Sequence, residues 1–287
     1  MSHKVQEGTI QALLNAAIQA LQTTSKSPRA DAEILLAHCL NKSRTWLFTW
    51  ADKTLESDSD VVTAFQRLLA NRLRGVPIAH LTGYREFWTL NLNVTPDTLI
   101  PRPETELLVE TALSLLPTTP PTILDLGTGT GAIALSIASE RPDCQMLACD
   151  FSAAAVEVAK ENARNNGIVN VAFALSDWFT ALPAQRFDMI VSNPPYIEVD
   201  DPHLQQGDVR FEPLSALTAG QDGLDDIRQI IRSAPHWLAT NGWLLLEHGY
   251  NQGQAVTTLL RERGFQAVRC LADLAGNERV SLGQWHN

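Results

Sequence analysis

The stretch TILDLGTGTG, from Thr122 to Gly131, joins an apolar strand to a turn that contains three glycines. The apolar run that follows it, from Ala132 to Ala138, is typical of a buried helix. Glycine at a strand-to-helix turn permits positive φ and lets a ligand approach the backbone closely. The stretch therefore predicts a site for an adenosine-containing cofactor on a doubly wound, mostly parallel sheet.

The glycine loop by itself leaves two cofactors open. Gly127, Gly129 and Ala132 match the relaxed dinucleotide pattern G-x-G-x-x-G/A, and Asp150 ends the next apolar segment, where a ribose-binding acid is expected. Asp125 favours S-adenosylmethionine over a dinucleotide. A carboxylate before the loop can hold the ammonium group of a methionine tail, whereas it would repel a pyrophosphate.

A second motif, NPPY at Asn193–Tyr196, follows the apolar run 188–191, which has the character of a buried strand. Pro194 and Pro195 have fixed φ and no N–H, so they stiffen the strand end. The Asn193 side-chain carbonyl and the Pro194 backbone carbonyl are then acceptors beside an aromatic ring, which suits a planar NH2 group. A plain proline-terminated strand is the alternative interpretation, and the glycine loop upstream disfavours it.

With these motifs on one chain, the sequence resembles the HemK/PrmC family of protein-(glutamine-N5) methyltransferases. The segments that carry the resemblance lie between about residue 75 and residue 280: Gly75–Gly83, Leu99–Glu106, Asp125–Leu135 with Asp150, Asn193–Tyr196 and Asp273–Val280. NPPY is shared by many amino-group methyltransferases, so it indicates the class only. The IPRPETE segment, Ile100–Glu106, is more specific. A sister family that methylates a ribosomal-protein glutamine carries a Pro-Arg-Ser-Pro type sequence there, which Pro103 does not match.

The resemblance implies an α/β fold of the class I methyltransferases, with a seven-stranded sheet, a terminal antiparallel hairpin and a small helical bundle before it. It implies S-adenosylmethionine as methyl donor, S-adenosylhomocysteine as product, and the glutamine of the Gly-Gly-Gln motif in class I peptide chain release factors as acceptor. Asn193, Pro194 and Tyr196 are the expected catalytic residues, and Pro195 joins them in binding substrate. The expected cofactor-binding residues are Asp125, Gly127, Thr128, Gly129, Thr130, Gly131, Asp150, Asp177, Trp178 and Asn193.

Three other functions remain open on the sequence. They are a ribosomal-protein glutamine methyltransferase, a nucleic-acid N6-adenine or N2-guanine methyltransferase, and a non-catalytic module that binds S-adenosylmethionine. Charge argues against a nucleic-acid substrate, because the net charge is −10, with 22 Lys and Arg against 32 acids, and proteins that neutralise phosphates usually present a basic face. A local cluster at Arg67, Arg72, Arg74 and Arg85 fits a solvated helix face better than a phosphate site.

The remaining composition predicts a cytoplasmic protein. An apolar fraction of 45% is ordinary for a chain that buries a core. No apolar run approaches the ~18 residues of a membrane span, and Met1–Lys4 leads into a polar stretch rather than a signal peptide. Four cysteines without C-x-x-C spacing indicate reduced thiols, and the histidines show no metal-ligand spacing. We expect a monomer with no metal and no membrane partner.

The pattern of elements predicts three segments. Residues 1–82 are expected to form a helical substrate-recognition domain, with helices near 5–22, from Pro28 and over 61–74, because apolar residues recur there at helical spacing. Residues 83–100 are expected to form a hairpin linker, with one strand over 87–94 paired to Thr98–Ile100. Residues 101–287 alternate strands and helices and form the catalytic domain. The expected helices lie at 103–116, 131–140, 152–166, 224–239 and 251–263, and the expected strands at 122–126, 145–149, 171–175, 188–192, 243–247, 265–271 and 279–285.

Strand ends predict where the site lies. Ligands of such sheets bind outside the carboxyl ends of the strands, and Asp125, Asp150, Asp177 and Asn193 each lie at or just past such an end. We therefore expect all four to face one crevice, with Trp178 beside the adenine. Glu247-His248 also ends a strand and is a candidate for the border of this pocket.

Overall fold

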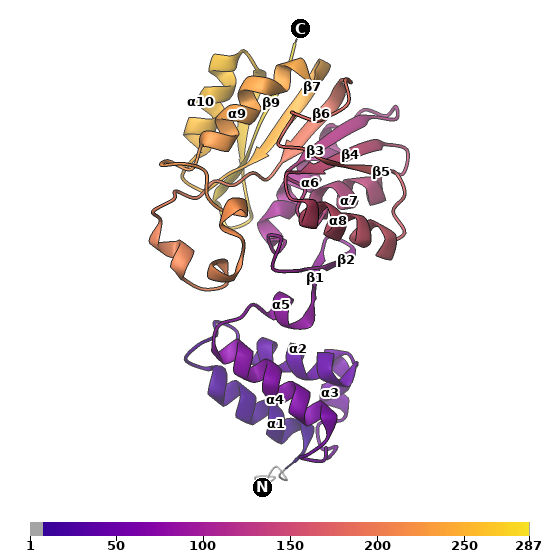
Figure 1. Ribbon diagram of the computed structural model, residues 1–287, viewed down its shortest axis with the longest axis vertical. Helices are drawn as coiled ribbons and strands as arrows, with labels where there is room; N and C mark the ends of the chain where they lie inside the picture. The colour runs from indigo at the N-terminus through magenta and orange to yellow at the C-terminus, as the bar shows by residue number, and fades with distance from the viewer. Residues whose placement is uncertain (1–7, 287) are drawn as a thin grey trace. The chain divides into compact units, whose positions relative to one another are not determined.

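The computed structural model describes residues 8–286 and divides into two compact units (Figure 1). The helical unit comprises the chain up to Gly83 together with residues 205–211, and the sheet unit comprises residues 84–204 and 212 onward. Residues 5–7 of the first expected helix, and Met1–Lys4, lie outside the described residues. None of the helices in residues 8–286 has the length and apolar character that crossing a membrane requires.

Five helices build the helical unit, and serine or threonine side chains fix where three of them begin. The helices are α1 (Ile10–Leu21), α2 (Pro28–Leu40), α3 (Arg44–Thr49), α4 (Asp60–Leu73) and α5 (Ile78–Thr82). Thr9, Ser43 and Ser59 each accept a backbone N–H from the first turn of α1, α3 and α4, which satisfies donors that a helix start leaves unpaired. The helices expected near 5–22, from Pro28 and over 61–74 are present as α1, α2 and α4; within the described residues the first of them begins at Ile10 rather than earlier.

The segment Gln205–Phe211 packs with these helices although it lies far along the chain. Arg72 in α4 donates from Nε to Asp31 Oδ2 at 2.7 Å and from Nη1 to Asp208 Oδ1 at 3.2 Å. Arg210 donates to the backbone carbonyl of Arg74 at 2.7 Å. The chain just beyond the NPPY motif is therefore held by the helical unit.

The sheet unit contains a short hairpin and a seven-stranded sheet. The hairpin pairs β1 (Tyr84–Phe87) with β2 (Leu90–Asn93). The strands of the sheet are β3 (Thr122–Leu126), β4 (Gln145–Asp150), β5 (Val171–Leu175), β6 (Phe187–Ser192), β7 (Leu238–Glu247), β8 (Gln266–Ala272) and β9 (Glu278–Gln284). The helices are α6 (Glu106–Leu115), α7 (Ala132–Glu140), α8 (Ala153–Asn165), α9 (Asp225–Ser233) and α10 (Gly253–Arg263), and a 3-10 turn at Pro103–Thr105 precedes α6.

The strands of the seven-stranded sheet lie in the order β5-β4-β3-β6-β7-β9-β8. Strands β3 to β7 pair in parallel, and β9 pairs antiparallel with both β7 and β8. The predicted fold, a mostly parallel seven-stranded sheet with a terminal antiparallel hairpin after N-terminal helices, is confirmed. The chain places β4 and β5 on one side of β3, and then returns to place β6 and β7 on the other side. The boundary between β3 and β6 is therefore the topological switch point, where such sheets bind ligands.

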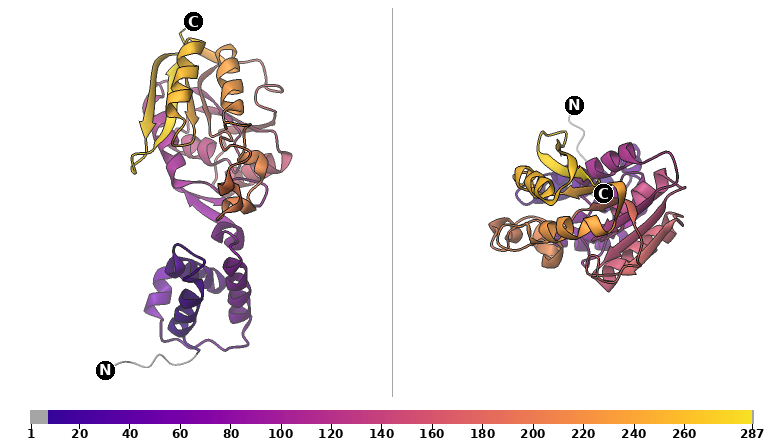
Figure 2. Two further views of the ribbon diagram at one scale, coloured as in Figure 1. Left: turned by 90° about the vertical axis from the view of Figure 1, so that its left-hand side faces the viewer. Right: turned by 90° about the horizontal axis from the view of Figure 1, so that it is seen from above.

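Helices cover both faces of this sheet because its strands are apolar on both sides. Side chains at alternate strand positions enter two separate cores, as Ile123 and Leu124 do in β3. Helices α6, α7 and α8 contribute to one core, and α9 and α10 to the other (Figures 1 and 2). Because β3, β4, β6 and β7 run parallel, their carboxyl ends all lie at one edge of the sheet.

Four predicted elements differ from the structure: the strands at 87–94 and 98–100, the helix at 224–239 and the start of the strand at 243. The hairpin turns at Trp88, whose φ is +55° and whose backbone N–H donates to Glu106 Oε1 at 3.0 Å; residues 87–94 are therefore not one strand, and Thr98–Ile100 forms no strand. The predicted helix 224–239 ends at Ser233, because Pro235 in the next turn has no N–H to continue it. Strand β7 consequently begins at Leu238, five residues before the predicted start at 243.

Candidate active site

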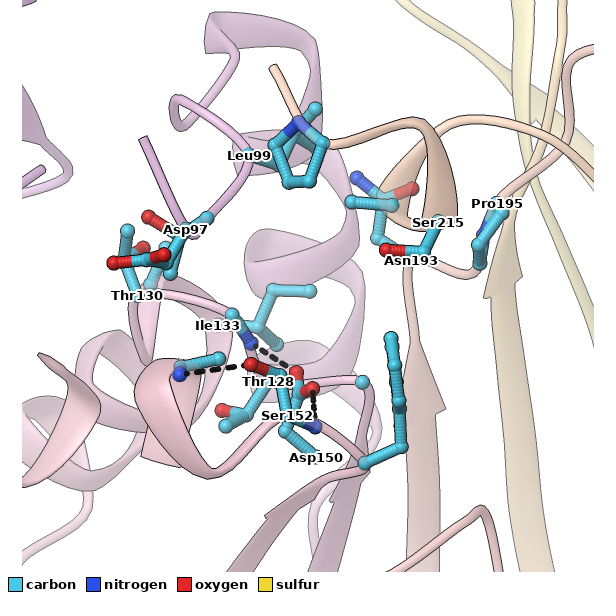
Figure 3. Close-up of a pocket in the computed structure, with 18 of the residues that line it drawn as sticks. Asp97, Leu99, Thr128, Thr130, Ile133, Asp150, Ser152, Asn193, Pro195 and Ser215 are labelled. Atoms are coloured by element: carbon cyan, nitrogen blue, oxygen red, sulfur yellow. Dashed lines mark hydrogen bonds between the residues drawn. The ribbon is translucent and has the colours of Figure 1, made fainter. Parts of the chain in front are cut away.

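A cavity of about 440 Å³ opens at the carboxyl edge of the sheet, within the sheet unit (Figure 3). Most of the site residues that the sequence predicts line it: Gly127, Thr128, Gly129, Thr130, Asp150, Asp177, Trp178, Asn193 and Pro195. Asp125, Gly131, Pro194 and Tyr196 are not among the residues that line it. The sequence motifs thus converge on one cavity, with four of their members behind its surface.

The glycine loop is held against the end of β4 by its own backbone. Gly127 and Thr128 both donate their N–H groups to the Cys149 carbonyl at 2.9 Å. Gly131 has φ +84°, and a Cβ there would lie 3.0 Å from a Leu135 methyl carbon. Glycine is required at this position both for its φ and for the close packing of α7.

Asp150 is the acid of the cavity wall. Its Oδ2 accepts the Gly129 N–H at 2.9 Å and its Oδ1 accepts the Ser152 N–H at 2.9 Å, and the residue is 7% exposed. Burial raises the pKa of this carboxyl, against the lowering effect of the backbone N–H groups. Each oxygen keeps a second lone pair, so the carboxylate can accept two hydroxyl groups from a ligand.

Asp125 lies beneath the loop rather than in the cavity wall. It is fully buried, and its Oδ2 accepts the Thr128 hydroxyl at 2.6 Å. Burial raises the pKa of Asp125 to about 7, partly offset by the Thr128 hydrogen bond. This geometry supports the shape of the loop, while direct contact of Asp125 with a ligand remains a proposal.

Asn193 lies on the other side of the cavity from Asp150 (Figure 3). It follows β6, and its Nδ2 donates to Thr105 Oγ1 at 3.3 Å. Its Oδ1 is buried and has no hydrogen-bond partner. Asn193 lines the cavity, so its side chain holds an unsatisfied acceptor at the cavity wall.

Tyr196 is held by its backbone, and its ring is partly buried. Its N–H donates to the Leu217 carbonyl at 3.2 Å, and its carbonyl accepts Gln252 Nε2 at 3.0 Å. The ring packs against the core under α9 and α10. Burial, and then the charge of Glu247, raises the pKa of the phenol. Tyr196 is therefore a neutral, anchored side chain in this structure.

Several residues of the cavity wall were not predicted from the sequence. Phe151 is 57% exposed, lines the cavity and follows Asp150 directly, so its place after the acid of the cavity wall is a signal that could have identified it. Leu99, Pro101 and Arg102 belong to the segment Leu99–Glu106, which carries the family resemblance, but no place in the cavity wall was predicted for them. Further wall residues come from segments without a local motif, among them Pro96, Asp97, Thr98, Ser215, Ala216 and Asp226. The wall segments 96–102 and 212–216 are joined by an ion pair between Arg102 and Glu212, and Glu212 Oε1 also accepts the Ile100 N–H at 2.9 Å.

No group of three or more His, Cys, Asp or Glu side chains within residues 8–286 has an arrangement that could hold a metal ion. The polar residues that line the cavity include four acids, one base, one amide and several hydroxyl groups: Asp97, Asp150, Asp177, Asp226, Arg102, Asn193, Thr98, Thr105, Thr128, Thr130, Ser152, Ser176 and Ser215. This donor set fits an organic ligand with hydroxyl groups and an acceptor with N–H groups.

The strand order, the glycine loop after β3 and the Asn-Pro-Pro-Tyr motif after β6 define the fold of a class I methyltransferase. Solved methyltransferases have the same fold at low identity. A methyltransferase from Pyrococcus furiosus aligns with a TM-score of 0.54 at 17% identity, over 77% of this chain and all of that one. A 16S rRNA N2 G1207 methyltransferase from T. thermophilus, solved with AdoMet and guanosine, aligns with a TM-score of 0.53 at 20% identity, over 70% of this chain and 49% of that one.

Family models and relatives specify the class further. The model of the PrmC N-terminal domain matches residues 12–83, and that of the methyltransferase small domain matches residues 103–207. Curated relatives named release factor glutamine methyltransferase include those of Vibrio cholerae, 52% identical over 96% of this chain and 97% of the relative, and Escherichia coli K12, 52% identical over 95% and 98%. The relative from Pseudomonas aeruginosa is 54% identical over 91% of this chain and 94% of its own length. The chain belongs to the release factor glutamine methyltransferase family.

Proposed function

We propose that this chain transfers a methyl group from S-adenosylmethionine to the side-chain amide nitrogen of a glutamine, the one in the Gly-Gly-Gln motif of class I peptide chain release factors. The observation that carries the proposal is the pairing of two features across one cavity. Asp150 presents carboxylate lone pairs on one side, and Asn193 presents an unpaired amide oxygen on the other. Near-full-length relatives that carry the name of this activity support the choice of acceptor.

The residues of the cavity fit an adenosine cofactor. Asp150 would accept the two ribose hydroxyls, and the glycine loop would lie along the methionine tail. Phe151 and Trp178 line the same wall and offer aromatic faces to a purine. When bound, S-adenosylmethionine supplies a sulfonium methyl group, and the protein contributes binding and orientation.

The acceptor side must compensate for the weak nucleophilicity of an amide. The lone pair of an amide nitrogen is delocalised into its carbonyl, the same resonance that gives the ~18–20 kcal/mol rotation barrier of a peptide bond. Asn193 Oδ1 and the Pro194 carbonyl would each accept one N–H of the substrate amide, which aims its nitrogen at the methyl group. These acceptors gain strength as positive charge develops on the nitrogen, so they stabilise the transition state more than the ground state.

We also propose that residues 1–82 form a domain that recognises the substrate, and that the protein is a monomer. The helical unit presents Phe48 and Trp50 at its surface, each more than half exposed, and from Gly8 onward none of its residues lines the cavity. A surface without a reaction site fits a role in holding the release factor.

Mass spectrometry of release factor incubated with the protein and S-adenosylmethionine tests the proposal. We expect one added methyl group on the glutamine of Gly-Gly-Gln, and none on a release factor in which that residue is asparagine. Parallel reactions with rRNA, DNA and ribosomal proteins separate the other acceptors. Transfer of labelled methyl groups to one of these, with none to release factor, would contradict the proposed substrate.

A further inference from the structure

Glu247 is a buried carboxylate with no assigned role. It is the last residue of β7 and is fully buried. Strand β7 pairs with β6 in a register that sets Leu246 beside Ser192, so the next residues along the two strands, Glu247 and Asn193, lie at the same edge. An unpaired carboxylate in a protein interior is costly, and groups of this kind concentrate at functional sites.

No hydrogen bond of normal geometry reaches either carboxylate oxygen of Glu247. Burial is the main cause that raises its pKa to about 7; the Thr105 hydroxyl and the Asn193 amide face it closely enough to lower that pKa again. Glu104, in the 3-10 turn before α6, raises the pKa, and Arg279, in β9, lowers it. Arg279 is itself engaged, with its Nε donating to Asp273 at 3.3 Å. The Tyr196 phenol also senses the charge of Glu247, which raises the pKa of that phenol.

Resting on the proposed function, we infer that ionised Glu247 is a positioning residue that acts through Thr105 to set which way the Asn193 amide faces. Glu247 does not line the cavity, whereas Thr105 and Asn193 do. The three side chains therefore run from the interior of the sheet unit to the surface where the acceptor amide binds.

The argument follows from donors and acceptors. A carboxylate only accepts hydrogen bonds, so the Thr105 hydroxyl beside it directs its proton toward Glu247. The Thr105 oxygen then has only lone pairs to offer to Asn193, and it accepts Nδ2, as observed at 3.3 Å. With Nδ2 used in this way, Oδ1 is the atom of the amide left without a partner at the cavity wall, and it is the atom that the substrate amide would meet. The reversed amide would place Oδ1 against a lone pair of Thr105 and an NH2 group toward the substrate N–H groups.

Protonation of Glu247 removes this preference. A carboxylic acid can donate to Thr105, which frees the hydroxyl proton to point at Asn193 and stabilises the reversed amide. Methyl transfer should therefore require the ionised form of Glu247 and should increase with pH through about 7, the pKa of this residue. Asp125, whose pKa is also about 7, would contribute its own pH dependence, which a change at Glu247 does not remove.

Single-turnover methylation of release factor at saturating S-adenosylmethionine tests the inference with four variants of the full chain. Glu247→Gln keeps the size of the side chain but can donate, and Thr105→Val removes the hydroxyl. Thr105→Ser retains that hydroxyl and serves as the conservative variant. Glu278→Gln makes the same chemical change at an exposed glutamate of the neighbouring strand β9 and serves as the matched control.

We expect Glu247→Gln and Thr105→Val to lower the single-turnover rate roughly 10- to 100-fold, by analogy with partners that orient metal ligands. Thr105→Ser and Glu278→Gln should remain close to wild type. Calorimetry should give an unchanged S-adenosylmethionine affinity for Glu247→Gln. From about pH 6 to about pH 8, either side of the Glu247 pKa of about 7, the wild-type rate should rise. The rate of Glu247→Gln should rise less over this range, and any rise that remains is the part that Asp125 contributes.

The outcomes separate this inference from the function on which it rests. If wild type does not methylate release factor, the proposed function fails. If wild type is active and folded Glu247→Gln matches its rate and its pH profile, the positioning role is overturned while the function stands. A rate loss in Glu247→Gln with an unaltered pH profile, or with no loss in Thr105→Val, also overturns it, because packing alone would then account for the effect.

Discussion

Gly129 and Asp150 are joined by a hydrogen bond of 2.9 Å from the backbone nitrogen of the glycine to Oδ2 of the carboxylate. This bond connects the loop after β3 to the end of β4, the two segments that form one side of the cavity. Ser152 holds the other carboxylate oxygen at 2.9 Å. The carboxylate is therefore fixed before any ligand arrives, which reduces the entropy that binding must overcome.

Replacement of Asp150 by alanine should weaken cofactor binding strongly. Hydrogen bonds to a charged group contribute about 1.5–3 kcal/mol each, so the loss of even one corresponds to at least about a tenfold increase in Kd. Calorimetric titration with S-adenosylmethionine measures it. Asp143→Ala, at a partly exposed ion pair with Arg141, is the matched control. An unchanged Kd in folded Asp150→Ala would reject the ribose-binding role.

The sheet, and the edge of the sheet at which the cavity lies, were predictable from the sequence because local patterns determine them. Apolar runs of strand length alternate with helical runs, and parallel strands place all their carboxyl ends on one side. Asp150 and Asn193 were placed correctly for that reason. The prediction of a helix over 224–239 is wrong beyond Ser233, where α9 ends. The apolar periodicity continues past that point, but Pro235 has no N–H with which to continue the helix.

Side-chain direction and long-range partners were not predictable in the same way. Asp125 and Tyr196 belong to the right motifs, yet Asp125 is fully buried, Tyr196 is partly buried, and neither lines the cavity. No local pattern encodes that. The pairing of Arg102 with Glu212, and the packing of residues 205–211 in the helical unit, join positions about one hundred residues or more apart. Such contacts depend on the folded chain rather than on spacing.

Replacement of Arg72 by alanine should destabilise the helical unit and impair methylation of whole release factor. The change leaves Asp31, which is 7% exposed, without its cation and releases Asp208 from α4. We expect a cost of about 1–3 kcal/mol, measured by hydrogen exchange of the α2 and α4 amides. Cofactor affinity should be unchanged, because Arg72 is remote in sequence and absent from the cavity wall.

Arg67→Ala is the matched control for this variant, since Arg67 is exposed on the same helix. Its effect should lie within about 0.5 kcal/mol, as for ordinary surface substitutions. Normal exchange protection in Arg72→Ala would show that the ion pairs with Asp31 and Asp208 add nothing to stability. A normal methylation rate would show that the anchoring of residues 205–211 is not needed for recognition.

Replacement of Glu247 by glutamine should increase stability at high pH although it lowers activity. The pKa of Glu247 is raised from 4.5 to about 7 in the folded state, so the folded protein holds a proton that the unfolded chain has released. Its contribution to stability is complete below about pH 4.5 and is lost as the pH rises to about 7. The raised pKa corresponds to roughly 3 kcal/mol of free energy of unfolding. The wild type loses this amount once the pH is above the pKa of Glu247 and the buried carboxyl is ionised.

Urea unfolding of wild type and Glu247→Gln at about pH 5 and about pH 8 measures this effect, with both conditions chosen around the raised pKa. The variant should gain stability relative to wild type at the higher pH and gain much less at the lower pH. Asp125 titrates in both proteins and cancels in the comparison. Equal differences at the two pH values would mean that Glu247 is not buried as an acid with a raised pKa.

Replacement of Asn193 by alanine should abolish most turnover and leave cofactor binding nearly intact. The side-chain oxygen of Asn193 is buried and unpaired in the cavity wall, and it gains strength as the substrate nitrogen becomes positive. By analogy with the removal of one oxyanion-hole partner, the loss should be on the order of 10²–10³ in kcat.

Asn193→Asp should also be impaired, because its carboxylate would face the buried Glu247 and one of the two would have to take up a proton. Asn165→Ala, at the exposed end of α8, is the control, and single-turnover rates with release factor are the measurement. A rate for Asn193→Ala within a factor of about three of wild type, far from the expected loss, would remove this residue from the catalytic role.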